Sequence, residues 1–142
     1  PVDVHVVNRG DEAFKIDGDG DIVQEYGPGD VLFDGVAQTC ATATVSYWGY
    51  RIRMFPYATL KWGFAMLRCF NGSPQDILMH LPSFWRGRFP KADCVDFLYN
   101  DIEIQTQGRS LAYQKIGEGE GHAQSVRWRV ADRPVRLAVP LH

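Results

Sequence analysis

Three carboxylates stand at alternate positions of a glycine-rich stretch, Asp17-Gly18-Asp19-Gly20-Asp21. Oxygen ligands on a flexible loop of this kind can bind a hard cation such as Ca²⁺. An EF-hand is excluded, because that loop needs glycine where Ile22 stands and a bidentate glutamate where Pro28 stands. We therefore interpret Asp17, Asp19 and Asp21 as a solvated acidic turn and predict no metal site. A subsite at a subunit contact is the alternative.

A serine, an aspartate and a histidine lie close together at Ser73, Asp76 and His80, and these are the residue types of a hydrolase triad. Any chain of this size offers such combinations, and there is no Gly-x-Ser-x-Gly elbow. We expect His5 and His80 to lie on strands. None of the histidines has a metal-ligand spacing; they are His5, His80, His122 and His142. The sequence therefore predicts no catalytic residue, no metal ligand and no cofactor, and it does not indicate an enzyme.

The cysteines Cys40, Cys69 and Cys94 form an odd set without a Cys-x-x-Cys spacing. Neither a disulfide framework nor a zinc knuckle is expected from them. We predict buried, reduced thiols and a reducing compartment. The apolar stretches are far too short to span a membrane, so no membrane partner is expected.

Cations and tryptophans are interleaved in the middle of the chain, an arrangement that can bind RNA. We prefer the interpretation that the cations are the polar faces of strands, paired with acidic residues, because the net charge is -2. RNA on one face is the alternative. The residues are Arg51, Arg53, Lys61 and Arg68 with Trp48 and Trp62.

The elements that must position these residues show one pattern: short runs alternating apolar and polar residues, broken by glycine and proline. Residues 2–6, 102–105, 126–130 and 135–139 all have a period of two, which gives a strand one apolar and one polar face. A chain of 142 residues with 45% hydrophobic content is large enough for one domain with a real core. We predict an all-β, antiparallel sandwich over residues 1–142, with at most one or two short helices.

Eleven runs have a strand-like pattern, from which about nine or ten strands are expected. Thr59 to Phe70 also has a helical apolar spacing, but we favour a strand because Gly63 would weaken a helix by about 1 kcal/mol. We expect residues 82–90 to form a loop, and residues 91–100 to form a short helix or an irregular crossover. The predicted strands are 2–8, 13–16, 22–26, 42–48, 50–55, 59–70, 76–81, 101–106, 111–116, 123–130 and 134–140, with a short apolar run at 31–33.

Three stretches resemble parts of picornavirus-like jelly-roll capsid proteins. Residues 2–16 (VDVHVVNRGDEAFKI) resemble the last strand of such a jelly roll and its Gly-Asp turn. Residues 61–82 (KWGFAMLRCFNGSPQDILMHLP) resemble an aromatic strand followed by a returning strand, and residues 121–140 (GHAQSVRWRVADRPVRLAVP) resemble a run with an apolar-Val-Pro ending. Because the stretch like the final strand comes first, a fragment of a longer polyprotein is an alternative to a complete domain.

The resemblance implies a structural protein of a virus capsid, whose copies or related subunits pack edge to edge around RNA. It implies a location in the virion, and in the host cytoplasm during assembly. We expect residues 41–58 and 84–89 to lie at subunit contacts. The alternatives are a β-sandwich module that binds carbohydrate or protein through Trp48, Trp85 and Trp128, and, less favoured, a small hydrolase.

Overall fold

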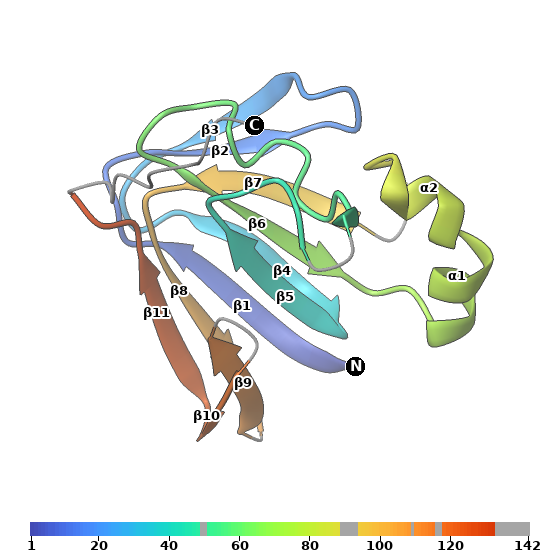
Figure 1. The fold of residues 1–142 in the computed structure, drawn as a ribbon. Coiled ribbons are helices and arrows are strands. Elements are labelled where there is room, and N and C mark those ends of the chain that lie inside the picture. The colour runs from blue at the N-terminus through green and yellow to red at the C-terminus, as the bar shows by residue number, and fades with distance from the viewer. Residues whose placement is uncertain (49–50, 89–93, 109, 116–117, 133–142) are drawn as a thin grey trace.

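The chain folds into two antiparallel sheets that face each other, with a small separate hairpin and two short helices (Figure 1). The computed structural model describes residues 1–48, 51–88, 94–108, 110–115 and 118–132. The predicted all-β antiparallel sandwich is confirmed. The elements are β1 (Val2–Asn8), β2 (Ala13–Ile16), β3 (Ile22–Tyr26), β4 (Val31–Ala37), β5 (Thr39–Ala43), β6 (Ala65–Phe70), α1 (Pro74–Met79), α2 (Leu81–Trp85), β7 (Cys94–Tyr99), β8 (Asp101–Thr106), β9 (Leu111–Lys115), β10 (Glu118–Ala123) and β11 (Ser125–Arg129).

One sheet has the strand order β11-β8-β1-β4, the other has the order β3-β2-β7-β6-β5, and β9 pairs with β10. β1 and β4 pair in the first sheet, whereas their chain neighbours β2 and β3 pair in the second. The first four strands are therefore one long antiparallel hairpin bent across both layers. The consecutive strands β7 and β8 follow the same bend, because β7 pairs with β2 in the second sheet and β8 pairs with β1 in the first.

The bend between β1 and β2 depends on Gly10. A Cβ at this position would overlap Oδ1 of Asn100, so a larger residue cannot occupy the corner without displacement. The buried Asn8 supports the same corner, because its Nδ2 donates to Gly27 O over 2.8 Å and its Oδ1 accepts from Gly10 N over 3.1 Å. These bonds satisfy an amide that burial would otherwise make costly.

The main core lies between the sheets and follows the alternation of the strands. β1 directs Val4 and Val6 inward, and β8 directs Ile102 inward, which is what a period of two predicts. Leu67 and Phe97 meet them from the opposite sheet.

A second core covers the other face of the five-stranded sheet. Met66 and Leu98 lie on this outer face, and Phe55 and Ala58 of residues 44–64 pack over them. β6 and β7 are consequently buried on both faces, whereas β3 is mostly exposed.

Several predicted elements are wrong between residues 42 and 100. β5 ends at Ala43, and within residues 44–64 the described part contains only an isolated bridge between Trp48 and Ile52 in place of the strands predicted at 42–48 and 50–55. The strand predicted at 59–70 begins only at Ala65. Tertiary packing explains the missing strands, because the described part of residues 44–64 packs on a face of the five-stranded sheet and does not pair with its edge.

The predicted strand 76–81 is instead α1, and the predicted loop 82–90 contains α2. Ser73 caps α1, with Ser73 Oγ and the Asp76 carboxylate each bonding the other residue's backbone N–H. The helix or crossover predicted at 91–100 is wrong, because residues 94–99 are the strand β7. The predicted strand 134–140 lies outside the described residues, and the region 123–130 contains the end of β10 and all of β11. Neither described helix is long and apolar enough to cross a membrane.

Candidate functional site

The described part of residues 44–64, which we call the cover segment, lies against the outer face of the five-stranded sheet. Besides Phe55 and Ala58, polar contacts fasten it. The Tyr57 hydroxyl donates to Gly18 O over 2.8 Å. Lys61 Nζ lies 2.7 Å from Glu12 Oε1 and 4.0 Å from the centre of the Phe14 ring, so its charge meets both a carboxylate and an aromatic face.

A further attachment comes from a buried ion pair beneath the cover segment. Arg68 of β6 donates through Nε and Nη2 to the two carboxylate oxygens of Asp96 on β7, over 2.7 and 2.6 Å. The side chains are only 4% and 9% exposed. Arg68 Nη1 also donates to Met54 O of the cover segment. Because a buried charge requires a partner and satisfied hydrogen bonds, this geometry fixes the position of the cover.

The outer side of the cover segment exposes large apolar side chains. Trp62 is 85% exposed and Tyr47 is 61% exposed, although both are the kinds of residue that bury large areas elsewhere. The segment's other exposed large apolar residues are Val45, Trp48 and Leu60. Val45, Tyr47 and Trp48 lie within the range 41–58 that the sequence analysis assigns to subunit contacts.

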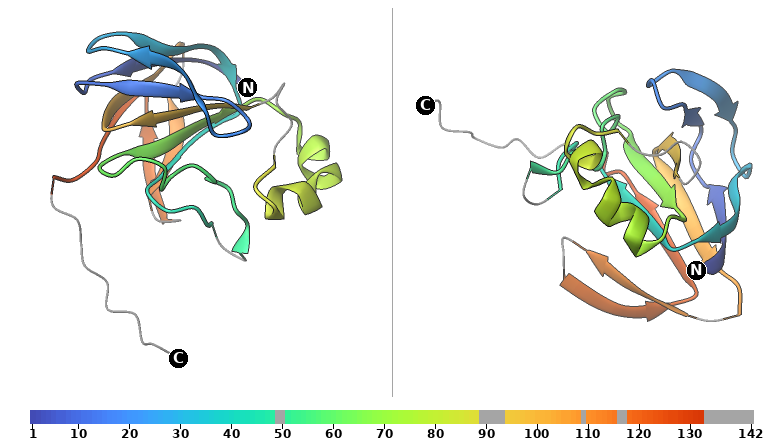
Figure 2. Two further views of the ribbon diagram at one scale, coloured as in Figure 1. Left: turned by 90° about the horizontal axis from the view of Figure 1, so that it is seen from above. Right: turned by 90° about the vertical axis from the view of Figure 1, so that its right-hand side faces the viewer.

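The helices present a second group of exposed apolar side chains. Leu78 and Met79 of α1 are 73% and 80% exposed, and Trp85 of α2 is about half exposed. The turn after α2 contacts the cover segment, since a Cβ at Gly87 would meet Arg53 Cδ at 3.1 Å. Figure 2 shows the helices beside this segment. We refer to these exposed residues of the cover segment and the helices together as the apolar surface.

Sequence reasoning missed Leu78 and Met79, because it placed residues 76–81 on a strand. The signal that could have found them is Ser73-Pro74-Gln75-Asp76, a capping serine with proline at the first helical position.

The acidic turn, Asp17 to Asp21, is held by hydrogen bonds between one of its carboxylates and its own backbone N–H groups. Asp17 Oδ1 accepts from the N–H groups of Asp19 and Asp21 over 2.9 and 3.0 Å. Within the described residues, no group of three His, Cys, Asp or Glu side chains could hold a metal ion.

Ser73, Asp76 and His80 come close together, but not as a catalytic triad. Ser73 Oγ donates to Asp76 Oδ2 over 2.5 Å as part of the helix cap. This hydrogen bond lowers the pKa of Asp76 below its ordinary value. His80 Nδ1 lies 2.9 Å from the backbone oxygen of Asp76. In a catalytic triad the histidine would instead form a hydrogen bond with the serine hydroxyl that it activates. His80 is at the end of α1, so its predicted strand is wrong, whereas His5 does lie on β1.

The mixed basic and aromatic set does not form one free cationic face. Arg68 forms a buried ion pair with Asp96 and Lys61 pairs with Glu12, so both have the acidic partners that the preferred interpretation predicts. The predicted strand position is correct only for Arg68, since Arg51, Arg53 and Lys61 lie in the segment before β6. Trp128 of β11 is half-buried and packs against the main core, unlike the exposed Trp48. Of the remaining histidines, His122 is exposed on β10 and His142 lies outside the described residues.

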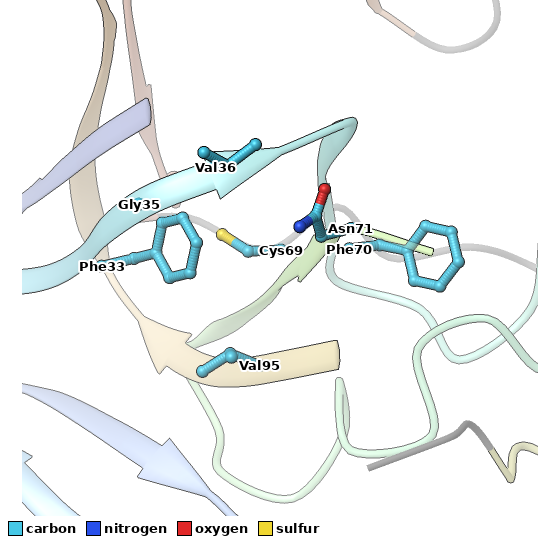
Figure 3. A pocket seen from close by; sticks show the side chains of 7 residues that line it. All are labelled: Phe33, Gly35, Val36, Cys69, Phe70, Asn71 and Val95. Carbon is cyan, nitrogen blue, oxygen red and sulfur yellow. The ribbon is translucent and has the colours of Figure 1, made fainter. Parts of the chain in front are cut away.

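Two cavities border the sheets. One of about 580 Å³ lies beside the acidic turn and contains Tyr57, Arg68, Arg88 and Asp96 in its lining. The other, of about 260 Å³, lies between β4 and the strands β6 and β7, and Figure 3 shows Phe33, Val36, Phe70 and Val95 around it together with Cys69.

Comparison with known proteins gives no match: no family model, no curated protein and no solved structure is significantly similar to this chain. Function therefore has to be argued from the fold and from the apolar surface.

Proposed function

We propose that this chain is a structural subunit of a virus capsid, which packs edge to edge with further copies or with related subunits around RNA. Two features support the proposal. The two facing antiparallel sheets form a β-sandwich, the double-sheet architecture to which the jelly rolls of viral capsid and lectin domains also belong. The resemblance of residues 2–16, 61–82 and 121–140 to capsid strands points the same way. The subunit would reside in the virion, and in the host cytoplasm during assembly.

The apolar surface is the observation that carries the proposal. Trp62 and Met79 are almost fully exposed, although covering them would remove large apolar areas from water. Apolar surface of this kind on a folded domain marks contacts with a partner. In an assembled shell, neighbouring subunits would cover this apolar surface and remove it from water.

The test is the size of the particle that the chain forms. Sedimentation and electron microscopy of the purified protein should show large symmetric assemblies. Trp62→Ser combined with Met79→Ser should shift the population to small species, whereas Lys115→Ser, an exposed polar position on β9, should leave assembly unchanged. A stable, monodisperse monomer at high concentration would contradict the proposal.

The second candidate function is a β-sandwich module that binds carbohydrate or protein, and the exposed Trp48 and Trp85 favour it. Trp128, the third tryptophan assigned to this function, is half-buried against the core and is not an open platform. A binding module would stay monomeric and show quenching of tryptophan fluorescence with soluble glycans. Quenching that is lost in Trp48→Ala while the protein remains monomeric would favour this candidate over the capsid subunit.

A further inference from the structure

Cys40 and Cys69 face each other on adjacent antiparallel strands. They occupy paired positions of β5 and β6, both thiols are free, and their sulfurs lie 3.3 Å apart. Directly opposed residues in an antiparallel pair have Cα atoms roughly 4.5 to 5.5 Å apart, which falls within the range of about 4.4 to 6.8 Å that a disulfide spans. Bond formation therefore requires a small approach of the sulfurs and no rearrangement of the strands.

The third cysteine is excluded from this pair by the pleat of the sheet. Cys94 is paired with Phe70, the residue after Cys69 on β6. Since successive side chains of a strand point to opposite faces, Cys94 and Cys69 lie on different sides of the sheet. Cys94 thus provides an internal control for any chemistry at the pair.

The surroundings give the two thiols different reactivities. Cys69 is buried in the main core, whereas Cys40 is partly accessible. Their shared hydrogen bond lowers the pKa of the Cys40 thiol, and the same bond together with burial raises the pKa of the Cys69 thiol. Cys40 is therefore the thiol that ionises first, and the thiolate is the attacking form. The 260 Å³ cavity borders the Cys69 thiol (Figure 3).

We propose that Cys40 and Cys69 are a dithiol that forms a reversible disulfide by exchange with low-molecular-weight disulfides of the glutathione class. The Cys40 thiolate attacks one sulfur of the small disulfide, which breaks its S–S bond and releases one thiolate. The Cys69 thiolate then attacks the Cys40 sulfur of the mixed disulfide and releases the second. The protein loses two protons and two electrons, and the small disulfide gains them as two thiols.

The bond would close the chain across the base of the cover segment. Cys40 and Cys69 are 29 residues apart in sequence, and all of residues 44–64 lie between them. Oxidation would thereby tie the edge strand β5 to β6 at the base of the segment that bears five of the eight residues of the apolar surface. The proposal rests on the thiol geometry and stands whether or not the chain assembles into a shell.

The test is to incubate the folded protein with oxidised glutathione, quench with acid, alkylate the remaining thiols and map the peptides by mass spectrometry. The number of alkylated thiols should fall from three to one, with Cys94 as the thiol that is still alkylated. Cys94→Ser should form the same Cys40–Cys69 bond at an unchanged rate. Excess reduced glutathione should restore the thiols.

Single variants test the order of the steps. Cys69→Ser should accumulate a glutathione adduct on Cys40, whereas Cys40→Ser should leave Cys69 largely unmodified. The mapping of the wild-type protein does not depend on whether these variants fold. Three free thiols after prolonged incubation of the folded protein, or a disulfide that includes Cys94, would overturn the proposal.

Discussion

The buried pair of Arg68 and Asp96 allows a quantitative test of how the cover segment is held. The perturbation is a double-mutant cycle of Arg68→Met, Asp96→Leu and the double variant. Each single change leaves one charge buried without its partner. The double change replaces both charged groups with apolar side chains of comparable size, in a place where the pair is only 4% and 9% exposed.

The magnitude follows from this burial. Removing one partner of a buried ion pair costs about 3–5 kcal/mol, because the remaining charge is left uncompensated. Removing both leaves no such charge, but Met54 O loses its donor, which costs about 1–2 kcal/mol. The double variant should therefore be more stable than either single variant.

The assay is urea denaturation followed by tryptophan fluorescence. With a slope of about 2 kcal/mol per molar urea, each single variant should lower the midpoint by about 2 M, and the double variant by less than about 1 M. The reasoning would be refuted if the single changes cost less than about 1 kcal/mol, or if the double variant loses as much as their sum.

Two further predictions concern the corner and the surface. Gly10→Ala should destabilise the fold by about 1–3 kcal/mol, measured by the same denaturation, because its Cβ would collide with Asn100 Oδ1; an unchanged midpoint would contradict this. Hydrogen bonds from Ser125, Gln105 and Arg9 lower the pKa of Glu103 from 4.5 to about 2. The stability from Glu103 is therefore complete above about pH 4.5 and is lost as the pH falls toward 2, so the difference in free energy of unfolding from Glu103→Gln should shrink over this range. A constant difference would contradict it.

The sequence predicted the strands whose two faces differ. Residues 2–8 and 101–106 alternate clearly because one face meets the core and the other is more polar, and both predictions are confirmed. Residues 13–16 and 22–26 were found because glycine and aspartate mark their turn.

The sequence failed where tertiary packing removes the alternation. β7 is buried on both faces between two cores, so Phe97, Leu98 and Tyr99 form a continuous apolar run without a period. The cover segment has the β-branched and aromatic composition of strands, but its aromatic residues either pack onto a sheet face or are exposed.

The candidate site was predicted in part. The aromatic residues at 45–48 and Trp85 were assigned to a surface, and they are exposed. The exposure of Leu78 and Met79 could not be predicted, because these residues belong to α1, where the sequence favoured a strand. The pairing of Arg68 with Asp96 likewise requires the register of β6 and β7, which the sequence does not specify.

The pairing of β1 with β8 has a consequence for how the chain acquires its structure. The paired strands lie far apart in the sequence, and Arg9 and Glu103, which are bonded beside this pairing, are 94 residues apart. Folds dominated by such distant pairings have high contact order and fold slowly. During synthesis, the edge of β1 that pairs with β8 stays unpaired until residues 101–106 have been made, and an unpaired strand edge is prone to aggregation.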